Sequence, residues 1–381
     1  MINVNIIEYH CGYHYELIKY PPKNITYCLK GKNLEIYMDA LLDNPHNCER
    51  YVFFSDFYKG YNKTIHYFSN PADLIHSHVH PVVNKVPHVI DMEMFYFPYL
   101  IDSYEFRLIH ELKKTFVSVK KLTPKLKARL EKTKTFLRSK FCKKILPWSK
   151  WCRNYILDFI DEPEIVKKIE VLYPAMHNVV HKRKPAKNIR LLFICGYYSF
   201  ERKGGDDVMR LFDILRHYYN NIELTFIGLM PKNVYNKYRK YKNIKIYPFL
   251  RKNELFEVYK KSDIFILPTR HDSFGFSLLE AMNFNLPIIT TKGKLVPATQ
   301  EIVNDGISGF LIERKDMGVT NDIAGSINFK EFIGKTRLLI ENKKIREEMG
   351  KAGKEEIASG KFSLKKRNKR LKEIYEEALS L

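Results

Sequence analysis

Two acidic residues enclose a turn between a predicted strand and a predicted helix. Asp272 and Glu280 lie eight positions apart, with Gly275 between them. Ile264 to Leu267, just ahead of this turn, is a short apolar run ended by Pro268, which is typical of a strand buried in a parallel sheet. Amides at the start of the following helix favour an anionic ligand, and the two carboxylates suit the hydroxyls of a sugar or a ribose. An ordinary strand-helix-strand crossover with two surface acids is the alternative interpretation.

A second turn has the composition of a phosphate-binding site. The predicted strand Arg190 to Cys195 is followed by Gly196, and Arg202 and Lys203 precede a Gly-Gly pair and a helix predicted from about residue 206. Helix-start amides and two cations would converge there on a diphosphate. A solvated basic loop capped by Asp206 is the alternative interpretation.

The two turns resemble the donor site of the family-4 retaining glycosyltransferases, also described as glycosyl transferases group 1. In the family pattern two glutamates enclose a Gly-Phe-Gly-type turn, and here Asp272 stands at the first glutamate and Glu280 at the second. LLFICGYYSFERKGGDD from Leu191 resembles the family's strand, glycine turn and Lys-Gly pair, and EIVNDGISGFLIE from Glu301 resembles a further family segment. Three motifs in order over about 120 residues make the resemblance specific, whereas the first half of the chain matches loosely.

The resemblance implies a role for each residue of this site. Glu280 would accept hydrogen bonds from the ribose of a nucleotide-sugar, and Asp272, one methylene shorter than the usual glutamate, would bind hydroxyls of the donor sugar. Lys203 matches the family's lysine at the diphosphate. The family often has an arginine directly after the first glycine, but that position is Tyr197 here, so Arg202 is expected to supply the second charge. The expected donor-binding set is completed by Gly196, Phe274, Gly275, Phe276 and Ser277, with core packing as the alternative for the two phenylalanines.

The resemblance also implies an α/β fold of the GT-B type, with two Rossmann-like doubly wound domains facing a cleft and a last helix that crosses back to the first domain. The repeating strand-helix pattern of the second half agrees with a doubly wound parallel sheet. We expect an acceptor-side domain at residues 1–180, a polar, proline-bearing linker at 181–188, the donor domain at 189–362 and the crossing helix at 363–381.

Short apolar runs predict the strands of both halves. In the first half the predicted strands are Val4 to Tyr9, Tyr51 to Ser55, Leu74 to His78, Val89 to Met92, Phe116 to Val119, Lys144 to Pro147 and Glu170 to Tyr173. In the second half they are Arg190 to Cys195, Glu223 to Ile227, Ile244 to Tyr247, Ile264 to Leu267 and Ile288 to Thr290, and helices are predicted after Phe332.

Three histidines in the first half are two positions apart, so His76, His78 and His80 would share one face of a strand. This spacing invites a metal site. However, Pro81 ends the strand, the sequence fixes no partner acid, and the resembled family needs no metal. We therefore expect no metal and no cofactor, and we expect His78 to contact the acceptor.

Further acceptor-side candidates lie nearby. Glu93 stands where the resembled family usually carries a histidine at the sugar and β-phosphate, and Asp91 lies two residues before it. Glu93 is a candidate to bind a sugar hydroxyl or to take the proton of the acceptor, and Asp91 is a weaker candidate for the same role. The alternative is that both acids pair with lysines. Gly12, in the loop expected after the first strand, is the third candidate.

Composition limits the class of protein. A chain of 381 residues is long enough for two domains with a core each. The six cysteines form no Cys-x-x-Cys pair, and no apolar run approaches the length of a spanning helix, so we expect a cytoplasmic protein. The net charge of +22 indicates anionic partners.

The positive charge is concentrated between Lys113 and Arg153, where fifteen lysines and arginines accompany the single acid Glu131. Apolar and aromatic residues such as Trp148 and Trp151 are interleaved with them. This pattern favours peripheral attachment to the anionic inner face of a cell membrane. Nucleic-acid binding and a plain solvated helix face are the alternatives.

The resemblance, together with these residues, implies a retaining glycosyltransferase of cell-envelope glycan synthesis. It would move a sugar, without a metal, from a nucleotide-diphospho-sugar to a lipid-linked or glycan acceptor, with Lys203, Arg202, Asp272 and Glu93 at the reaction. The alternative from another class is a protein that binds nucleic acid or another polyanion on a degenerate scaffold, against which the retention of Glu280 and Lys203 argues. A sugar-nucleotide epimerase or a phosphorylase on the same fold lacks the sequence signals expected of it.

Overall fold

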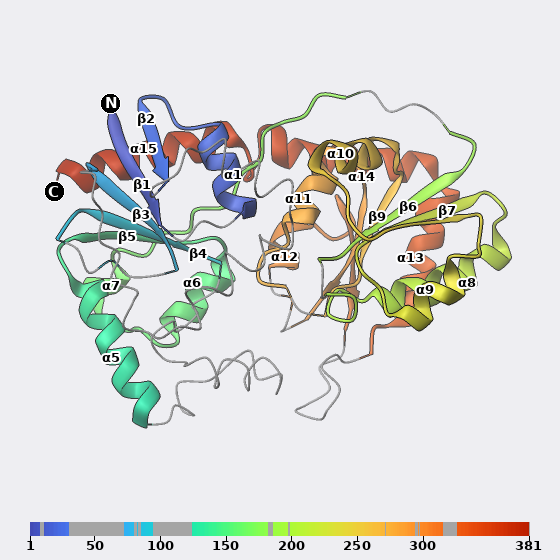
Figure 1. The fold of residues 1–381 in the computed structure, drawn as a ribbon, viewed down its shortest axis with the longest axis horizontal. Helices are drawn as coiled ribbons and strands as arrows, with labels where there is room; N and C mark the ends of the chain where they lie inside the picture. Colours follow the sequence, from blue (N-terminus) through green and yellow to red (C-terminus); the bar gives the residue numbers. More distant parts are fainter. Residues whose placement is uncertain are drawn as a thin grey trace. The chain divides into compact units, whose positions relative to one another are not determined.

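The chain consists of two α/β units, each built on its own parallel sheet (Figure 1). Met1–Ala175 together with Leu364–Leu381 forms the first unit, and Met176–Ser363 forms the second. The computed structural model describes residues 1–7, 11–29, 72–79, 82, 85–93, 124–181, 186–196, 199–270, 272–293, 296, 298–314 and 326–380.

The sheet of the first unit has the strand order β2-β1-β3-β4-β5 among the described residues, and every neighbouring pair is parallel. Helices α1 and α15 cover one face of this sheet, and α5, α6 and α7 cover the other (Figure 1). The elements are β1 Ile2–Ile7, α1 Cys11–Lys19, β2 Ile25–Leu29, β3 Leu74–His78, β4 His88–Met92, α5 Pro124–Arg138, β5 Cys142–Pro147, α6 Lys150–Leu157, α7 Pro163–Val166 and α15 Leu364–Ser380.

Two central strands of this sheet carry polar residues in buried positions. β3 reads LIHSH and β4 reads HVIDM, and every residue of both strands is buried. Strands covered on both faces are normally almost wholly apolar. Buried histidine and aspartate side chains in their place need partners, and these partners are found in the candidate site.

The sheet of the second unit has the order β11-β10-β9-β6-β7-β8, again with parallel neighbours throughout the described strands. From β6 the order runs outward through β7 and β8, and from β9 it runs outward in the other direction. In a doubly wound sheet, ligands bind beyond the carboxyl ends of the two strands at such a reversal. The elements are β6 Ile189–Ile194, α8 Gly205–Tyr218, β7 Ile222–Ile227, α9 Lys232–Tyr238, β8 Ile244–Tyr247, α10 Lys252–Lys261, β9 Ile264–Leu267, α11 Phe276–Asn283, β10 Ile288–Lys292, α12 Thr299–Ile302, β11 Gly309–Glu313, α13 Phe329–Glu341 and α14 Lys343–Ala358.

The predicted α/β class is confirmed, and so are most of the predicted strands that the structure describes. The strand predicted at Glu170 to Tyr173 is wrong. This segment runs beside β5, where the Glu170 amide donates to Ile145 O at 2.9 Å, but it does not form a regular strand. β2 and β11 were not predicted from the sequence. The predicted strands at 51–55 and 116–119 lie outside the described residues.

Helix α15 follows the second unit in the sequence and belongs to the first unit in space, as the resemblance implied (Figure 1). It packs on β3 and β5. Arg370 binds Glu170 in a fork, with Nε and Nη2 2.6 and 2.9 Å from the two carboxylate oxygens. Such paired hydrogen bonds fix both the position and the rotation of a helix.

Five apolar side chains in the described part of the basic segment, residues 124–153, lie in the protein interior. Leu130, Leu137, Ile145, Leu146 and Trp148 are all buried, and most of them belong to one core cluster of the first unit. The expectation that these interleaved apolar side chains face a membrane is therefore wrong. Their spacing reflects the packing of α5 and β5 into a core.

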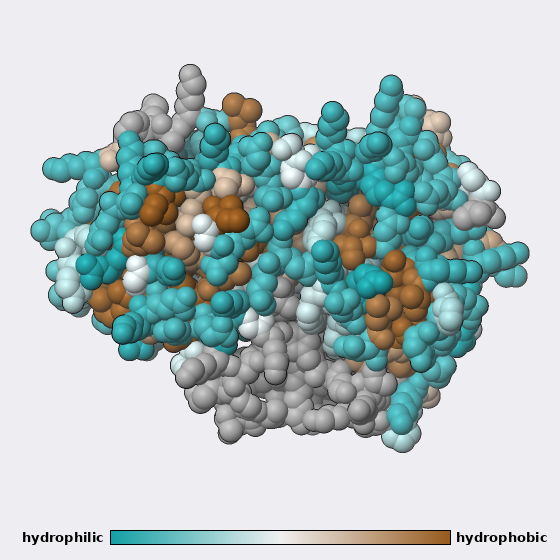
Figure 2. Space-filling view, turned by 180° about the vertical axis from the view of Figure 1, so that it is seen from behind, coloured by the Kyte–Doolittle hydropathy of each residue, from teal (hydrophilic) through white to brown (hydrophobic). Residues whose placement is uncertain are grey.

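Part of the positive charge of this segment is neutralised within the unit. Arg138 Nε lies 2.6 Å from Glu162, and Lys144 Nζ lies 3.1 Å from Glu170. Viewed from behind, the coloured surface is mostly hydrophilic, and its apolar residues form separate patches (Figure 2). Among the described residues no helix is both long and apolar enough to cross a membrane.

Candidate functional site

The turns after β6 and β9 are in direct contact. Gly204 has a φ of 76°, and a side chain there would place its Cβ 2.2 Å from the carbonyl oxygen of Pro268. The amide of Arg270 donates to the carbonyl of Arg202 at 2.8 Å. Glycine is required at position 204 because it permits both the left-handed backbone and the close approach. The two predicted motifs thus meet at the strand-order reversal of the second unit.

Lys203 and Asp272 form an ion pair across these turns. Lys203 Nζ lies 2.5 Å from Asp272 Oδ2, and the two side chains are only 14% and 9% exposed. Arg202, beside the lysine, donates from Nη2 to Ser199 Oγ at 2.8 Å. One carboxylate and two cations therefore lie together at the carboxyl ends of β6 and β9.

Both helices that follow these turns begin at a glycine. Gly204 is the N-cap of α8 and Gly275, with a φ of 97°, is the N-cap of α11, and neither helix start is capped by a side chain. A Cβ at Gly275 would lie 3.5 Å from Asp272 Oδ2, so the glycine keeps the backbone close to this carboxylate. Uncapped helix starts present amide groups and a positive dipole end to an anion.

Glu280 is held by a tyrosine that the sequence analysis missed. Tyr259 comes from α10, is fully buried, and donates from its hydroxyl to Glu280 Oε2 at 2.8 Å. Burial, followed by the charge of Glu280, raises the pKa of Tyr259 well above its usual value, so the phenol stays a hydrogen-bond donor. No motif spacing links the two residues, which are brought together by the packing of α10 against α11.

Of the remaining residues predicted to bind the donor, Phe274 lies in the core and the others are half-buried or exposed. Phe274 is buried, and its ring lies 5.3 Å from that of Phe276 and 6.4 Å from that of Phe362. The core-packing interpretation therefore holds for the Phe274 side chain. Phe276 and Ser277 are half-buried at the start of α11, and Gly196 is exposed after β6.

Two arginines that the sequence analysis also missed fix the first turn of α8. Arg314 Nη2 donates to Asp207 at 2.7 Å and to the Pro268 carbonyl at 2.9 Å. Arg270 Nη2 lies 2.5 Å from Asp206. Both acids of this turn are therefore bound by arginines of other elements, which ties α8 to the loop after β9.

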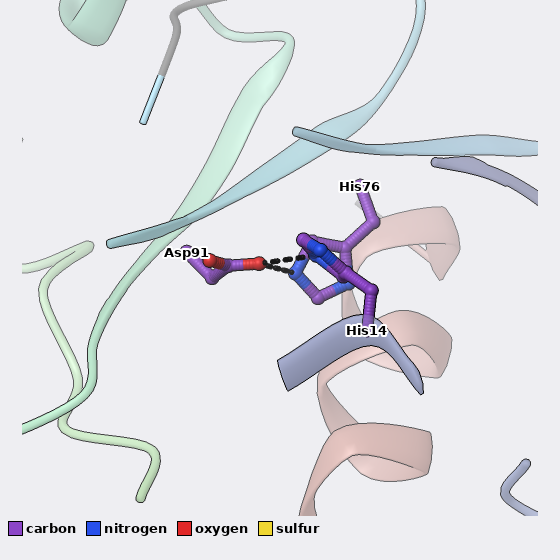
Figure 3. A group of neighbouring side chains, drawn as sticks. All are labelled: His14, His76 and Asp91. Atoms are coloured by element: carbon purple, nitrogen blue, oxygen red, sulfur yellow. Dashed lines mark hydrogen bonds and ion pairs between the residues drawn. The ribbon is translucent and has the colours of Figure 1, made fainter. Parts of the chain in front are cut away.

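In the first unit, Asp91 is the centre of a buried polar cluster. Its Oδ2 lies 3.0 Å from His14 Nε2 and 2.9 Å from His76 Nε2 (Figure 3). Its Oδ1 lies 2.5 Å from His78 Nδ1 and accepts from Trp148 Nε1 at 3.1 Å. Asp91 is completely buried, so its expected contact with an acceptor is wrong, and its partners are histidines, not lysines.

The protonation states of Asp91 and His14 follow from this buried environment. Burial raises the pKa of Asp91, but the neighbouring His78 and His14 outweigh it and hold the pKa well below its usual value. Burial lowers the pKa of His14 to about 3. Asp91 is therefore ionised and His14 neutral at pH 7. The sequence analysis found no partner acid for the histidines because the acid lies on the neighbouring strand.

The other acceptor-side candidates lie at or near this cluster. His78 is 11% exposed and is the most accessible of its histidines, and Glu93 is half-buried directly after β4. Gly12 lies in the first turn of α1. Val79, next to His78, has a φ of 65°, which is strained for a β-branched residue. His80 and Tyr197 lie outside the described residues.

The second unit matches a known family. Residues 180–356 match the family described as Glycosyl transferases group 1. Among curated proteins, the chain is 27% identical over 184 residues to the capsular polysaccharide biosynthesis glycosyltransferase CapM of Staphylococcus aureus, covering 45% of this chain and 42% of that protein. It is 30% identical over 182 residues to an uncharacterised glycosyltransferase of Methanocaldococcus jannaschii, covering 47% of this chain and 46% of that protein. The chain thus spans less than half the length of these relatives.

Solved structures extend the likeness to both units. Sucrose-phosphate synthase of Thermosynechococcus elongatus superimposes with a TM-score of 0.58 at 12% identity, covering 95% of this chain and 82% of that chain. WaaG, a glycosyltransferase involved in lipopolysaccharide biosynthesis, gives 0.53 at 15% identity and covers 98% of this chain and 99% of that one. The fold is therefore GT-B. Residues 180–356 match the glycosyl transferases group 1 family, which confirms the resemblance found in the motifs.

Proposed function

We propose that the chain is a retaining glycosyltransferase that takes a sugar from a nucleotide-diphospho-sugar. The Lys203–Asp272 pair carries this proposal, because it joins the two motif turns where the strand order of the group 1 domain reverses. Ligand binding beyond strand ends at such a reversal is the general rule for doubly wound sheets.

The proposed roles follow from the contacts. Glu280, oriented by Tyr259, accepts hydrogen bonds from the ribose. Asp272 binds the donor sugar, and Lys203 and Arg202 bind the diphosphate with the amides at the start of α8. Cations and amides placed in advance around a leaving group stabilise the charge that develops on it.

In the proposed reaction, the bond from the anomeric carbon to the diphosphate oxygen breaks as a bond to the acceptor oxygen forms on the same face of the sugar. The leaving diphosphate keeps the electron pair of the broken bond, and the proton of the acceptor hydroxyl passes to the Glu93 carboxylate. Lys203 and Arg202 supply the positive charge that some other transferases take from a divalent ion, so the transfer itself proceeds without one. Glu93 remains the proposed carboxylate on the acceptor side.

A lipid-linked or glycan acceptor of cell-envelope synthesis is part of the proposal. It is supported by the names of the relatives, since CapM is described as a capsular polysaccharide enzyme and WaaG as a lipopolysaccharide enzyme. We also propose a cytoplasmic enzyme that attaches to anionic membrane by charge alone, through exposed lysines such as Lys127, Lys140 and Lys150.

A thermal-shift screen with UDP-, GDP-, ADP- and TDP-sugars tests the donor site. A ligand at about 100 times its Kd stabilises the folded state by about 2.7 kcal/mol, which raises Tm measurably. The variant Glu280→Gln is expected to lose this shift, whereas Glu347→Gln, an exposed glutamate on α14, is expected to keep it. If no nucleotide-sugar raises Tm, or if both variants respond like the parent, the donor assignment is wrong.

A further inference from the structure

The buried cluster around Asp91 has no part in the proposed donor chemistry, yet it concentrates metal-binding groups. His14 comes from α1, His76 from β3 and Asp91 from β4, and all three are completely buried (Figure 3). One atom from each lies within 4.8 Å of the other two. Three separate elements thus aim nitrogen and oxygen atoms at one point inside the first unit.

One atom of this cluster has no satisfactory partner. His76 Nε2 lies 2.9 Å from Asp91 Oδ2, but within the described part of the chain it makes no hydrogen bond of acceptable geometry. Buried polar atoms without a hydrogen bond are rare in proteins, and a bound ion or water is one explanation for such an atom. A cation bound near Oδ2 would satisfy the ring nitrogen and the carboxylate together.

The outer atoms of the same side chains are already occupied. His76 Nδ1 lies 2.6 Å from the hydroxyl of Tyr375 on α15, which leaves Nε2 to face Asp91. Asp91 Oδ1 is bound by His78 Nδ1 and Trp148 Nε1, which leaves Oδ2 to face the two imidazoles. Metal sites in proteins characteristically have such outer hydrogen bonds, because these orient the ligands and set the tautomer of each histidine.

The chemistry of the three ligand atoms indicates which kind of ion they would bind. Two imidazole nitrogens and one carboxylate oxygen suit Zn²⁺ and similar first-row divalent ions, whereas Mg²⁺ and Ca²⁺ prefer oxygen ligands alone. Structural zinc sites have four ligands, whereas catalytic sites have three protein ligands and keep the fourth position open to a substrate or water. The three ligands here leave one position for a water molecule. Because all three are completely buried, a substrate does not reach this position, and the ion is structural.

We propose that His14 Nε2, His76 Nε2 and Asp91 Oδ2 bind a Zn²⁺ ion that holds α1, β3 and β4 of the first unit together. His78, Trp148 and Tyr375 orient the ligands. This site is separate from the proposed transfer, whose donor residues belong to the second unit. Failure of one proposal therefore leaves the other standing.

Metal analysis of the full chain tests the proposal. The protein is purified without a histidine tag, and its zinc is measured by mass spectrometry. About one zinc per chain is expected, together with a Tm that falls after prolonged chelation and recovers with Zn²⁺ but not with Mg²⁺. Background zinc in the parent, with no rise in Tm on addition of Zn²⁺, means that hydrogen bonds alone hold the cluster and overturns the proposal.

Variants locate the ion. His14→Gln and His76→Gln are each expected to reduce bound zinc to background, and His78→Gln is expected to weaken zinc binding by about 10- to 100-fold through loss of an orienting contact. His217→Gln, an exposed histidine on α8 of the second unit, serves as the matched control and is expected to keep its zinc. Equal zinc in the ligand variants and the control places the ion elsewhere and overturns the assignment. The measurement on the parent remains decisive if a ligand variant does not fold.

Discussion

Lys203 Nζ lies 2.5 Å from Asp272 Oδ2, so the cation proposed for the diphosphate is also the partner of the acid proposed for the sugar. The pair connects the turn after β6 with the turn after β9. A donor would place its phosphates and its sugar beside both charges at once. Removal of one member leaves the other poorly solvated, so effects on activity and on stability have to be separated.

Lys203→Gln is expected to lower kcat by about two orders of magnitude, because a positive charge on the leaving diphosphate is lost. It is also expected to lower the free energy of unfolding by about 1 to 3 kcal/mol, since the buried Asp272 carboxylate loses its ion pair with Lys203. Steady-state kinetics and urea unfolding measure the two effects.

The double variant Lys203→Gln with Asp272→Asn is the control, because it removes the Asp272 charge together with the lysine. It is expected to regain stability relative to Lys203→Gln but not activity. A Lys203→Gln enzyme with the kcat of the parent contradicts the proposed role of the lysine, whatever its stability.

Local motifs of the second unit were predictable because each lies in one turn. Asp272, Gly275 and Glu280 fall within nine residues, and Lys203 follows a strand whose apolar run is unmistakable. The glycines at positions 204 and 275 also indicate turns in the sequence, because both have a left-handed backbone conformation, which favours glycine.

Contacts between distant elements could not be predicted in this way. Tyr259 reaches Glu280 from another helix, and Arg314 reaches Asp207 from 107 positions away. His14 and Asp91 meet although 77 positions separate them. Such pairs depend on how the helices pack on the sheet, and a single sequence does not reveal this packing. For the same reason, core residues such as Trp148 were interpreted from the sequence as part of a membrane-binding surface.

Tyr259→Phe is expected to weaken donor binding without abolishing transfer. The phenol holds the Glu280 carboxylate, and loss of one hydrogen bond to a charged group costs about 1.5 to 3 kcal/mol, which corresponds to about tenfold or more in affinity. The expected signature is a raised KM for the donor with kcat little changed, and Glu280→Gln is expected to be worse than Tyr259→Phe. An unchanged donor KM in Tyr259→Phe means that the tyrosine does not position Glu280 for binding.

EDTA in the assay is expected to leave the initial rate unchanged, and added Mg²⁺ or Mn²⁺ is expected not to raise it. Lys203, Arg202 and the start of α8 supply the charge at the diphosphate in the proposed mechanism. The assay is kept short, because slow loss of a buried ion from the first unit is a different process. Immediate inhibition by EDTA that Mn²⁺ reverses contradicts metal-independent transfer.

Membrane attachment is expected to depend on salt. Core residues such as Leu137 and Trp148 in the described part of the basic segment are not available to a bilayer, so we expect charge to be the main attraction. The Debye length, over which charges are screened, falls from about 8 Å at 0.15 M to about 3 Å at 1 M salt. Co-sedimentation with anionic vesicles is expected to disappear in high salt and to weaken when Lys127, Lys140 and Lys150 are replaced by Gln. Equal sedimentation with neutral and anionic vesicles, or with neither, removes the membrane proposal.

His88 is expected to contribute, as the buried His14 does, to a loss of stability of the first unit in mild acid. His88 is buried at the start of β4, with Nδ1 3.0 Å from the Val86 carbonyl. Burial lowers its pKa from 6.5 to about 4, and the hydrogen bond to Val86 opposes this shift only in part. Between these two pH values the unfolded chain binds a proton that the folded chain does not. The contribution of His88 to the free energy of unfolding is therefore fully present above pH 6.5 and falls as the pH drops toward 4.

His88→Gln removes this titration, so its stability is expected to vary less with pH than that of the parent. The difference in slope approaches about 1.4 kcal/mol per pH unit, the value for one proton, whatever the absolute stability of the variant. Urea unfolding at pH 7.5, 6, 5 and 4.5 measures it, with the exposed His217→Gln as the control. Parallel pH profiles for the parent and His88→Gln mean that His88 titrates in the folded chain as it does in the unfolded one. In that case the buried setting of this histidine does not set the acid sensitivity of the first unit.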